Sequence, residues 1–182
     1  VGTFTMSGGT INLVQRNTTA TAANRRDYNI ALPNANCNVT GGILNVGTSA
    51  TATNFDFCVQ GPMPSMVIYN NCKAYTTTGS AVIFGDVTIG PGATLDPAVW
   101  YINVDGNVTN IGNVLNSGSI VTSTLTGRLI FRGTNGQQTY SGTGTCGTVG
   151  TPIELVHFDN SNGVVLSSLI YTMNLSIISG SA

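Results

Sequence analysis

The stretch SGGTINL at residues 7–13 recurs as TGGILNV at residues 40–46, 33 residues further along the chain. In both copies a pair of glycines leads into a segment that ends in alternating polar and apolar residues, as a half-buried β-strand does. Self-similarity at a fixed spacing is typical of repeat proteins, in which each repeat stacks on the next. The two stretches are therefore predicted to be equivalent strands of neighbouring repeats.

The sequence that follows each copy extends this repeat. A Thr/Ala run that ends in Asn occupies residues 18–24 and returns at residues 48–54, an offset of 30. The segment DYNI at residues 27–30 then returns as DFCV at residues 56–59, an offset of 29. Three matched blocks in the same order indicate an internal repeat with insertions, so we expect residues 27–30 and 56–59 to be equivalent strands.

The second half of the chain repeats on a shorter period. The segment GDVTI at residues 85–89 is echoed by GNVTNI at residues 106–111, an offset of 21. Around these segments, short apolar runs end at Gly, Pro, Asn or Asp, which are the residues that close strands and form turns. Further strands are predicted at residues 93–95, 100–104, 129–131, 138–140, 153–156, 164–166 and 175–177.

Short strands at this spacing predict an all-β fold, a right-handed parallel β-solenoid (β-helix). Residues 1–182 are expected to form one domain or a fragment of a longer repeat array. In such a fold Val, Ile, Leu and Phe point inward, while Thr, Asn and Ser point outward and form hydrogen-bonded ladders between coils. The alternative is a β-sandwich, in which longer alternating strands are joined by hairpin turns.

The composition excludes several other classes of protein. Only 7% of the residues are charged, whereas the chain contains 26 Thr, 23 Gly, 20 Asn and 14 Ser. The scarcity of Glu, Lys and Arg argues against a helical protein, and six basic residues against seven acidic ones cannot form a large nucleic-acid-binding patch. Hydrophobic residues make up 41% of the chain, too many for a disordered protein, yet no apolar run is long enough for a membrane-spanning helix.

The chain has four cysteines, Cys37, Cys58, Cys72 and Cys146, and no C-x-x-C pair. With one His in the sequence, a zinc site is poorly supported. An even number of cysteines in a chain this poor in charge indicates an oxidising compartment and at least one disulfide; four buried free thiols are the alternative. Cys37 and Cys72 are 35 residues apart, close to the 33-residue repeat, so stacking predicts a Cys37–Cys72 disulfide. A bond between Cys58 and Cys146 is left open.

Some of the repeated stretches have a recognisable pattern. They are FTMSGGTIN (4–12), GGILNVG (41–47) with the following ATNFDF, GRLIF (127–131) with GQQTYSGTG (136–144), and HFDN (157–160). Together they resemble the Gly/Thr/Asn-rich β-solenoid repeat regions of large secreted surface proteins of Bacteroidetes. The resemblance implies export by the type IX secretion system and, for some members, a role as gliding or attachment adhesins.

The same resemblance carries over no catalytic residue, and the cysteines are not part of the family's pattern. The family's C-terminal sorting domain has no counterpart in residues 1–182, which is what we expect of a fragment or a processed chain.

One cluster of titratable residues contains the His: Glu154, His157 and Asp159. On a strand, positions 154 and 157 point to opposite faces, whereas 157 and 159 share a face. A His–Asp pair could orient an imidazole or hold a metal, but the chain has no G-x-S-x-G nucleophile motif. A hydrogen bond at the edge of a coil is the favoured interpretation.

A second candidate consists of Asp86, Asp96 and Asp105, which follow one another at intervals of ten and nine residues, with Arg128 and Arg132 as side chains that could face them. Polysaccharide lyases and hydrolases built on β-helices use acidic clusters on one face, with Ca²⁺ or a pair of carboxylates. Asp beside Gly is, however, an ordinary turn residue, and we favour that interpretation.

The densest group of charges is Arg25-Arg26-Asp27. It could bind an anionic glycan, but a solvated corner with a local ion pair is the favoured interpretation.

We therefore expect a non-enzymatic extracellular module, a stiff stalk or adhesin of a secreted cell-surface protein, with no cofactor or metal. The alternatives are a subunit of a self-assembling extracellular filament and, third, a polysaccharide lyase or hydrolase. Expected partners are flanking repeats of the same protein, other copies of the chain or surface glycans, and not nucleic acid or a membrane. Because neither end of the sequence has a polar capping helix, the ends of the stack are expected to contact another chain or a continuation of this one.

Overall fold

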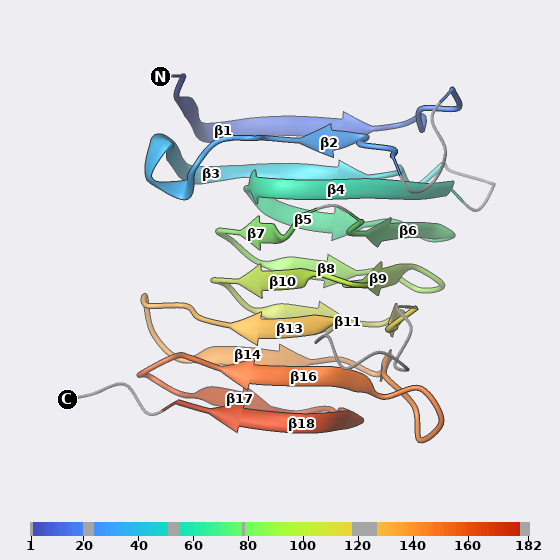
Figure 1. Ribbon diagram of the computed structural model, residues 1–182, viewed down its shortest axis with the longest axis vertical. Helices are drawn as coiled ribbons and strands as arrows, with labels where there is room; N and C mark the ends of the chain where they lie inside the picture. Colours follow the sequence, from blue (N-terminus) through green and yellow to red (C-terminus); the bar gives the residue numbers. More distant parts are fainter. Residues whose placement is uncertain (1, 20–23, 51–54, 78, 118–126, 179–182) are drawn as a thin grey trace.

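The computed structural model describes residues 2–19, 24–50, 55–77, 79–117 and 127–178 (Figure 1). These residues form β-strands and turns, with one short 3-10 helix among them, η1 (Asn34–Asn36). Every described strand pair is parallel, so the expected all-β fold is confirmed and the described pairs include no antiparallel hairpin of the kind that builds a β-sandwich. Nowhere in the described ranges is there a helix of the length and hydrophobicity that crossing a membrane requires.

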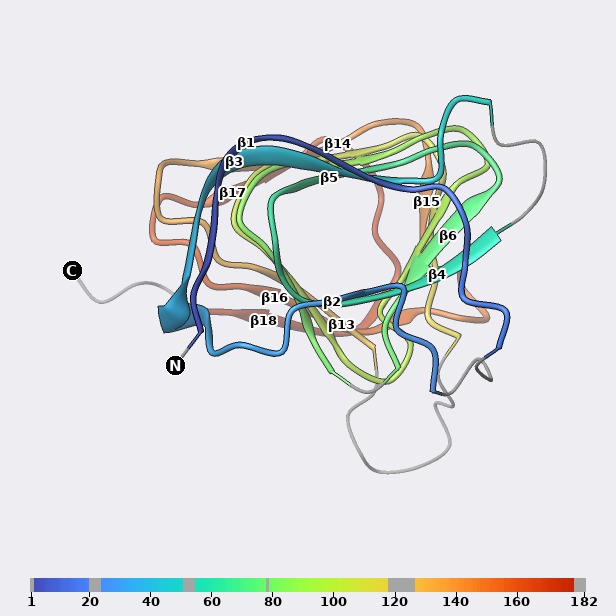
Figure 2. The ribbon, with the colours of Figure 1, turned by 90° about the horizontal axis from the view of Figure 1, so that it is seen from above.

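The strands belong to two curled sheets. The first sheet contains, in spatial order, β1 (Phe4–Leu13), β3 (Cys37–Val46), β5 (Ser65–Ile68), β8 (Val87–Ile89), β11 (Val108–Asn110), β14 (Gln138–Ser141) and β17 (Val164–Leu166). The second contains β15 (Thr145–Cys146), β12 (Asn113–Val114), β9 (Thr94–Asp96), β6 (Cys72–Tyr75), β4 (Phe55–Met63), β7 (Ala81–Ile83), β10 (Tyr101–Val104), β13 (Arg128–Phe131), β16 (Ile153–Phe158) and β18 (Thr172–Ile177), and β2 (Tyr28–Asn29) pairs with β4. Seen from above, the chain circles a common centre again and again (Figure 2).

The second sheet bends at β4, which has a different neighbour along each half. Its first part pairs with β6 and its second part, which begins at Gly61, pairs with β7. Gly61 has φ +83°, and a Cβ atom at this position would collide with the carbonyl oxygen of Ile30. Only glycine meets both conditions without strain. The bend splits the second sheet into two faces, so the wall of the molecule has three faces in all.

The register confirms the two spacings that carried the fold prediction. Ile11 lies beside Leu44 in the first sheet, so residues 33 positions apart are neighbours. Val87 lies beside Val108, so residues 21 positions apart are neighbours in the same sheet. The predicted strands in the second half are present, and the one at residues 164–166 has the predicted bounds.

The predicted equivalence of residues 27–30 and 56–59 is wrong by two positions. Tyr28 pairs with Val59, 31 residues further on, whereas the sequence match had placed it beside Phe57. The shift follows from the carboxylate of Asp27, which accepts a hydrogen bond from the backbone N–H of Cys58 at 2.7 Å. Residues 20–23 and 51–54 of the Thr/Ala runs lie outside the described residues.

Apolar ladders run through the stack and form the core. The first ladder, in the first sheet, consists of Ile11, Leu44, Met66, Val87, Val108, Tyr140 and Leu166. The second ladder, in the second sheet, consists of Met63, Ile83, Val104, Phe131, Phe158 and Ile177. The members between the two ends of the stack are buried, because alternate side chains of each strand point to the same face of its sheet.

Outward-facing polar side chains form ladders as well, which agrees with the expectation from composition. Asn45 Nδ2 donates to Asn12 Oδ1 at 2.8 Å, and Thr145 Oγ1 donates to Asn113 Oδ1 at 2.6 Å. Directly opposed residues of like charge would repel in such a stack. The scarcity of charged residues therefore follows from the parallel register.

The four cysteines are free thiols in the structure, and the predicted stacking of Cys37 on Cys72 is wrong. Cys37 begins β3 in the first sheet beside Phe4, whereas Cys72 begins β6 in the second sheet. The 35-residue spacing did not predict the positions of Cys37 and Cys72 correctly, because the chain passes from the first sheet to the second between them. A bond between Cys58 and Cys146 is equally remote, because β6, β9 and β12 lie between their strands.

Thiol labelling of the folded protein is expected to modify Cys37 first, because it is the one cysteine that is not buried. Burial raises the pKa of the Cys146 thiol to about 11, which lowers its thiolate fraction near pH 8 by roughly 100-fold. The pKa of this thiol is higher in the folded protein than in the unfolded chain. Its contribution to stability is therefore fully present below pH 9 and is lost as the pH rises from 9 to 11. Mass spectrometry after a short pulse of iodoacetamide, with and without denaturant, measures the order of reaction. Equal labelling of Cys37 and Cys146 without denaturant would contradict the expectation.

Candidate functional site

A row of polar pockets follows one corner of the stack, where the chain passes from the second sheet back to the first. Three pockets of about 330, 280 and 410 Å³ adjoin one another there. The first two share Ser65 and Asn135, and the second and third share Asp105. Together they form one surface from Val39 on β3 to Ser161 before β17, which we call the corner groove.

A ladder of side-chain acceptors builds the wall of the corner groove. Ser65 Oγ accepts the backbone N–H of Asp86 at 3.2 Å, and Asp86 Oδ1 accepts the backbone N–H of Asn107 at 2.7 Å. Asn107 Oδ1 in turn accepts the backbone N–H of Thr139 at 2.8 Å. Each corner residue therefore satisfies a backbone donor at the corner that precedes the next strand of the first sheet, which supports the turn interpretation of Asp86.

Two buried amides support the corner groove: Gln138 lines its floor, and Asn160 is hydrogen-bonded to Gln138. Gln138, 2% exposed, donates through Nε2 to the carbonyls of Val104 at 3.0 Å and Gly106 at 2.6 Å. Asn160, 6% exposed, donates through Nδ2 to Gln138 Oε1 at 3.0 Å and to the carbonyl of Gly136 at 2.9 Å. Because every one of these bonds is between different coils or turns, the two amides fix the corner segments against one another.

Asp105 and Arg132 form the ion pair of the groove, with Nε and Oδ1 2.9 Å apart. Partial burial raises the pKa of Asp105, and the adjacent guanidinium opposes that rise. Of the predicted acidic trio, the structure thus brings Asp86 and Asp105 to one groove, with Arg132 facing Asp105 as proposed.

The other two members of that predicted set lie elsewhere. Asp96 is fully buried on β9, where it pairs with Lys73 Nζ at 2.5 Å and accepts the backbone N–H groups of Ala98 and Ser117. Arg128 does not face the carboxylates, because its guanidinium stacks on the ring of Tyr101, 4.6 Å from the ring centroid. Both residues have structural roles.

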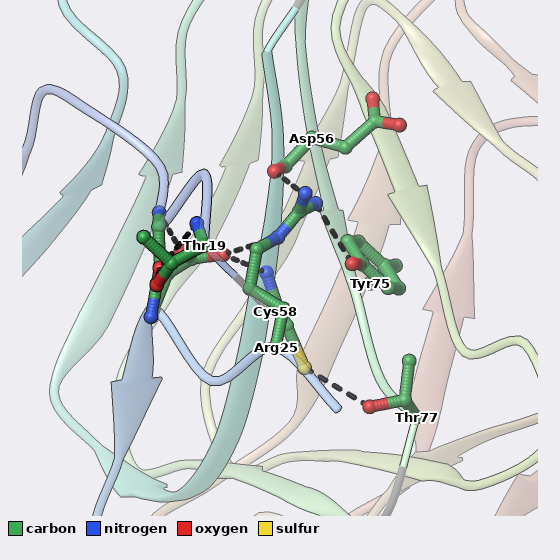
Figure 3. Close-up of polar contacts among 8 residues, drawn as sticks. Thr19, Arg25, Asp56, Cys58, Tyr75 and Thr77 are labelled. Atoms are coloured by element: carbon green, nitrogen blue, oxygen red, sulfur yellow. Dashed lines mark hydrogen bonds and ion pairs between the residues drawn. The ribbon is translucent and has the colours of Figure 1, made fainter. Parts of the chain in front are cut away.

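The Arg25–Asp27 pair is buried, so the prediction of a solvated corner is wrong. The two side chains are 7% and 2% exposed, and Nε lies 3.0 Å from Oδ2. Arg25 Nη2 also donates to Tyr75 Oη at 2.8 Å and to the carbonyl of Asp56 at 2.5 Å (Figure 3). With these partners Arg25 ties the segment before β2 to β4 and β6, and its buried guanidinium is already paired with a carboxylate.

The cluster of Glu154, His157 and Asp159 is spread along and beyond β16. His157 is half-buried between Ile130 and Ser176 of the neighbouring strands, and Asp159 follows the strand and lines the corner groove beside Arg132. In the described ranges no group of three or more His, Cys, Asp or Glu side chains is arranged to hold a metal ion.

Sequence reasoning missed Ser65, Gln138 and Asn160. Ser65 lies 21 residues before Asp86, so extending the 21-residue period backward would have found it. Gln138 and Asn160 are not in phase with that period, because the spacing between neighbouring coils is longer on that side of the molecule: Val108 pairs with Tyr140 across 32 residues.

The corner groove thus offers hydrogen-bond donors and acceptors, and two of its acidic side chains are engaged: Asp86 with a backbone N–H group and Asp105 with Arg132. Comparison of the chain with protein-family models, with curated proteins and with solved structures gave no match.

Proposed function

We propose that the chain is a non-enzymatic extracellular module, a right-handed parallel β-solenoid that serves as a stiff stalk or adhesin of a secreted cell-surface protein. The observation that supports this most is the first ladder, an apolar column that passes through all seven strands of the first sheet. In stacked repeats each coil contacts its neighbours alone, so stability adds coil by coil and the product is a rod. Such a rod holds its ends apart, which is the task of a stalk.

The resemblance to the Gly/Thr/Asn-rich repeats of secreted Bacteroidetes surface proteins points to the same place of action, the cell exterior, and to the type IX system as the route. The groove chemistry fits a binding role. Asp86 accepts a hydrogen bond from the backbone N–H of Asn107, and Asp105 forms an ion pair with Arg132. A general acid–base pair instead needs carboxylates that point toward a substrate.

Antibodies raised against the purified chain are expected to label intact cells that produce it natively, because a stalk or adhesin is displayed outside the cell. Immunofluorescence before and after permeabilisation measures this, with an antibody against a cytosolic protein as the control. Labelling that requires permeabilisation would rule out the surface role.

A filament subunit is the second candidate, and one observation favours it. Among the described residues no strand pairs with the outer edge of β17 or β18, and the inward-facing Leu166, Leu175 and Ile177 are 45%, 55% and 69% exposed. We call the exposed apolar side chains of β17, β18 and the segment around them the end face: Val165, Leu166, Leu169, Tyr171, Met173, Leu175, Ile177 and Ile178. No charged residue follows Asp159 in the sequence. Exposed apolar side chains without a charged neighbour favour contact with protein.

If the end face joins copies of the chain, sedimentation at rising concentration should show association that the double variant Leu175→Lys/Ile177→Lys abolishes. Two ammonium groups in an apolar contact are costly to desolvate. Val149→Lys is the matched control, because Val149 is 84% exposed and lies outside the end face. A monomeric parent chain, or association that survives the double variant, would exclude the filament role and leave the stalk proposal standing.

A further inference from the structure

We infer that the corner groove is a binding site for an uncharged linear polysaccharide that lies along the axis of the stack. The inference deepens the proposed adhesin role and rests on it, because it names the class of ligand that the module would hold.

The length of the groove suits a chain molecule. Its lining residues come from six successive strands of the first sheet and the corners before them, from β3 to β17. Five interstrand steps of roughly 4.8 Å make a surface about 24 Å long. Ser65, Asp86 and Asn107 line it at steps of 21 residues, so a polymer with repeating units meets a hydrogen-bonding side chain at each of these steps.

Part of the exposed lining consists of neutral polar groups. Asn135 and Gln137 project from the segment between β13 and β14, and each amide offers donors and an acceptor. The half-buried ring of Phe84 lies in the same pocket and gives an apolar patch between them and Ser65. Hydroxyl-rich ligands with apolar ring faces match this mixture of amide, hydroxyl and aromatic surface.

The charges in the groove disfavour an anionic polymer. Arg132, the cation that lines it, is already paired with Asp105 at 2.9 Å. Asp86 and Asp159 have no ion-pair partner among the described residues, so the groove carries excess negative charge. Like-charge juxtaposition reduces affinity and association rate, so polyuronates and sulfated glycans are expected to bind less tightly than uncharged polymers.

The floor of the groove is already fixed in the free protein. Gln138 and Asn160 hold the turns that carry Asn135 and Gln137 through bonds to three backbone carbonyls. A ligand therefore does not have to order the corner segments, and a preorganised surface binds with a smaller entropic cost.

Isothermal titration calorimetry with laminarin, pullulan and dextran as uncharged probes, and alginate as the anionic probe, tests the inference. At least one uncharged polymer is expected to bind more tightly than alginate. The double variant Asn135→Ala/Gln137→Ala should weaken that binding about tenfold, because it removes two hydrogen-bonding groups without touching the buried amides. Asn70→Ala is the matched control, because this exposed Asn lies in the turn between β5 and β6.

No binding of any uncharged probe, equal binding of alginate, or binding that the double variant leaves unchanged overturns the inference. Circular dichroism and the urea midpoint of the variants confirm that the fold is intact. The bound polymer is expected to keep its length on size-exclusion chromatography. These outcomes are separate from antibody labelling of intact cells, so the stalk proposal and the polysaccharide site can fail independently.

Discussion

Replacing Phe131 by alanine is expected to lower the free energy of unfolding by about 3–5 kcal/mol. Phe131 is fully buried in the second ladder, and its ring packs against Phe158 and Tyr140 with centroid distances of 5.4 and 6.1 Å. Truncation leaves a cavity between coils that the hydrogen-bonded strands above and below cannot close. Urea unfolding monitored by circular dichroism measures the change.

Ile130→Ala is the control for this experiment, since Ile130 is the preceding residue of the same strand and its side chain points outward. The control should cost about 1 kcal/mol or less, because only part of the side chain is removed from water. Phe131→Leu keeps most of the apolar volume and should fall between the two. If Phe131→Ala were no more harmful than Ile130→Ala, the inward assignment of the second ladder would be untenable.

Asp27→Leu is expected to cost about 3–5 kcal/mol as well, for a different reason. The substitution leaves the guanidinium of Arg25, whose side chain is 7% exposed, without its carboxylate. It also deprives the backbone N–H groups of Cys58 and Asn17 of their acceptor, which lies 2.7 and 2.8 Å away. The midpoint of urea unfolding, followed by intrinsic fluorescence, measures the loss.

Two companion variants separate the buried charge from general damage at this position. Arg25→Met/Asp27→Leu removes both charges and should be less destabilising than Asp27→Leu alone, because no unpaired ion remains buried. Arg26→Leu changes the adjacent, exposed arginine and should alter stability by less than about 0.5 kcal/mol. Equal losses for Asp27→Leu and Arg26→Leu would show that the pair is solvated after all.

The parallel stacking of strands could be predicted because short sequence motifs recur at the same spacing as the paired strands. Val87 and Val108 lie in matching pentapeptides, and the same 21-residue step is the register of the sheet. The position of Tyr28 could not be predicted in this way, because the repeated motif aligned it with Phe57 while the carboxylate of Asp27 sets a register two residues further on. Sequence similarity reports common local structure, whereas register also depends on side chains that reach between coils.

The candidate site was predictable to a smaller extent. Asp86 and Asp105 were found through their spacing, and both line the corner groove. Gln138 and Asn160 were not, because an amide that bonds to backbone carbonyls of other coils has no neighbour in sequence that marks it. The cysteine prediction failed for a related reason: a separation close to one period says nothing about which sheet the chain has reached.

The hydrogen bonds between corner side chains and backbone N–H groups recur every 21 residues, so this part of the chain can gain or lose length only in steps of 21 residues. The side chains of Ser65 and Asp86 each accept a backbone N–H from the residue 21 positions further on, Asp86 and Asn107 respectively. Each of these 21-residue segments also places one apolar side chain in the first ladder. A gene that gained or lost 21 codons within this region would encode a taller or shorter molecule in which neighbouring strands still pair in the same register. A change of 20 codons would turn each inward side chain of the affected strands outward. In the proposed solenoid the height of the molecule can therefore change in steps of 21 residues, while the inward positions keep their apolar side chains.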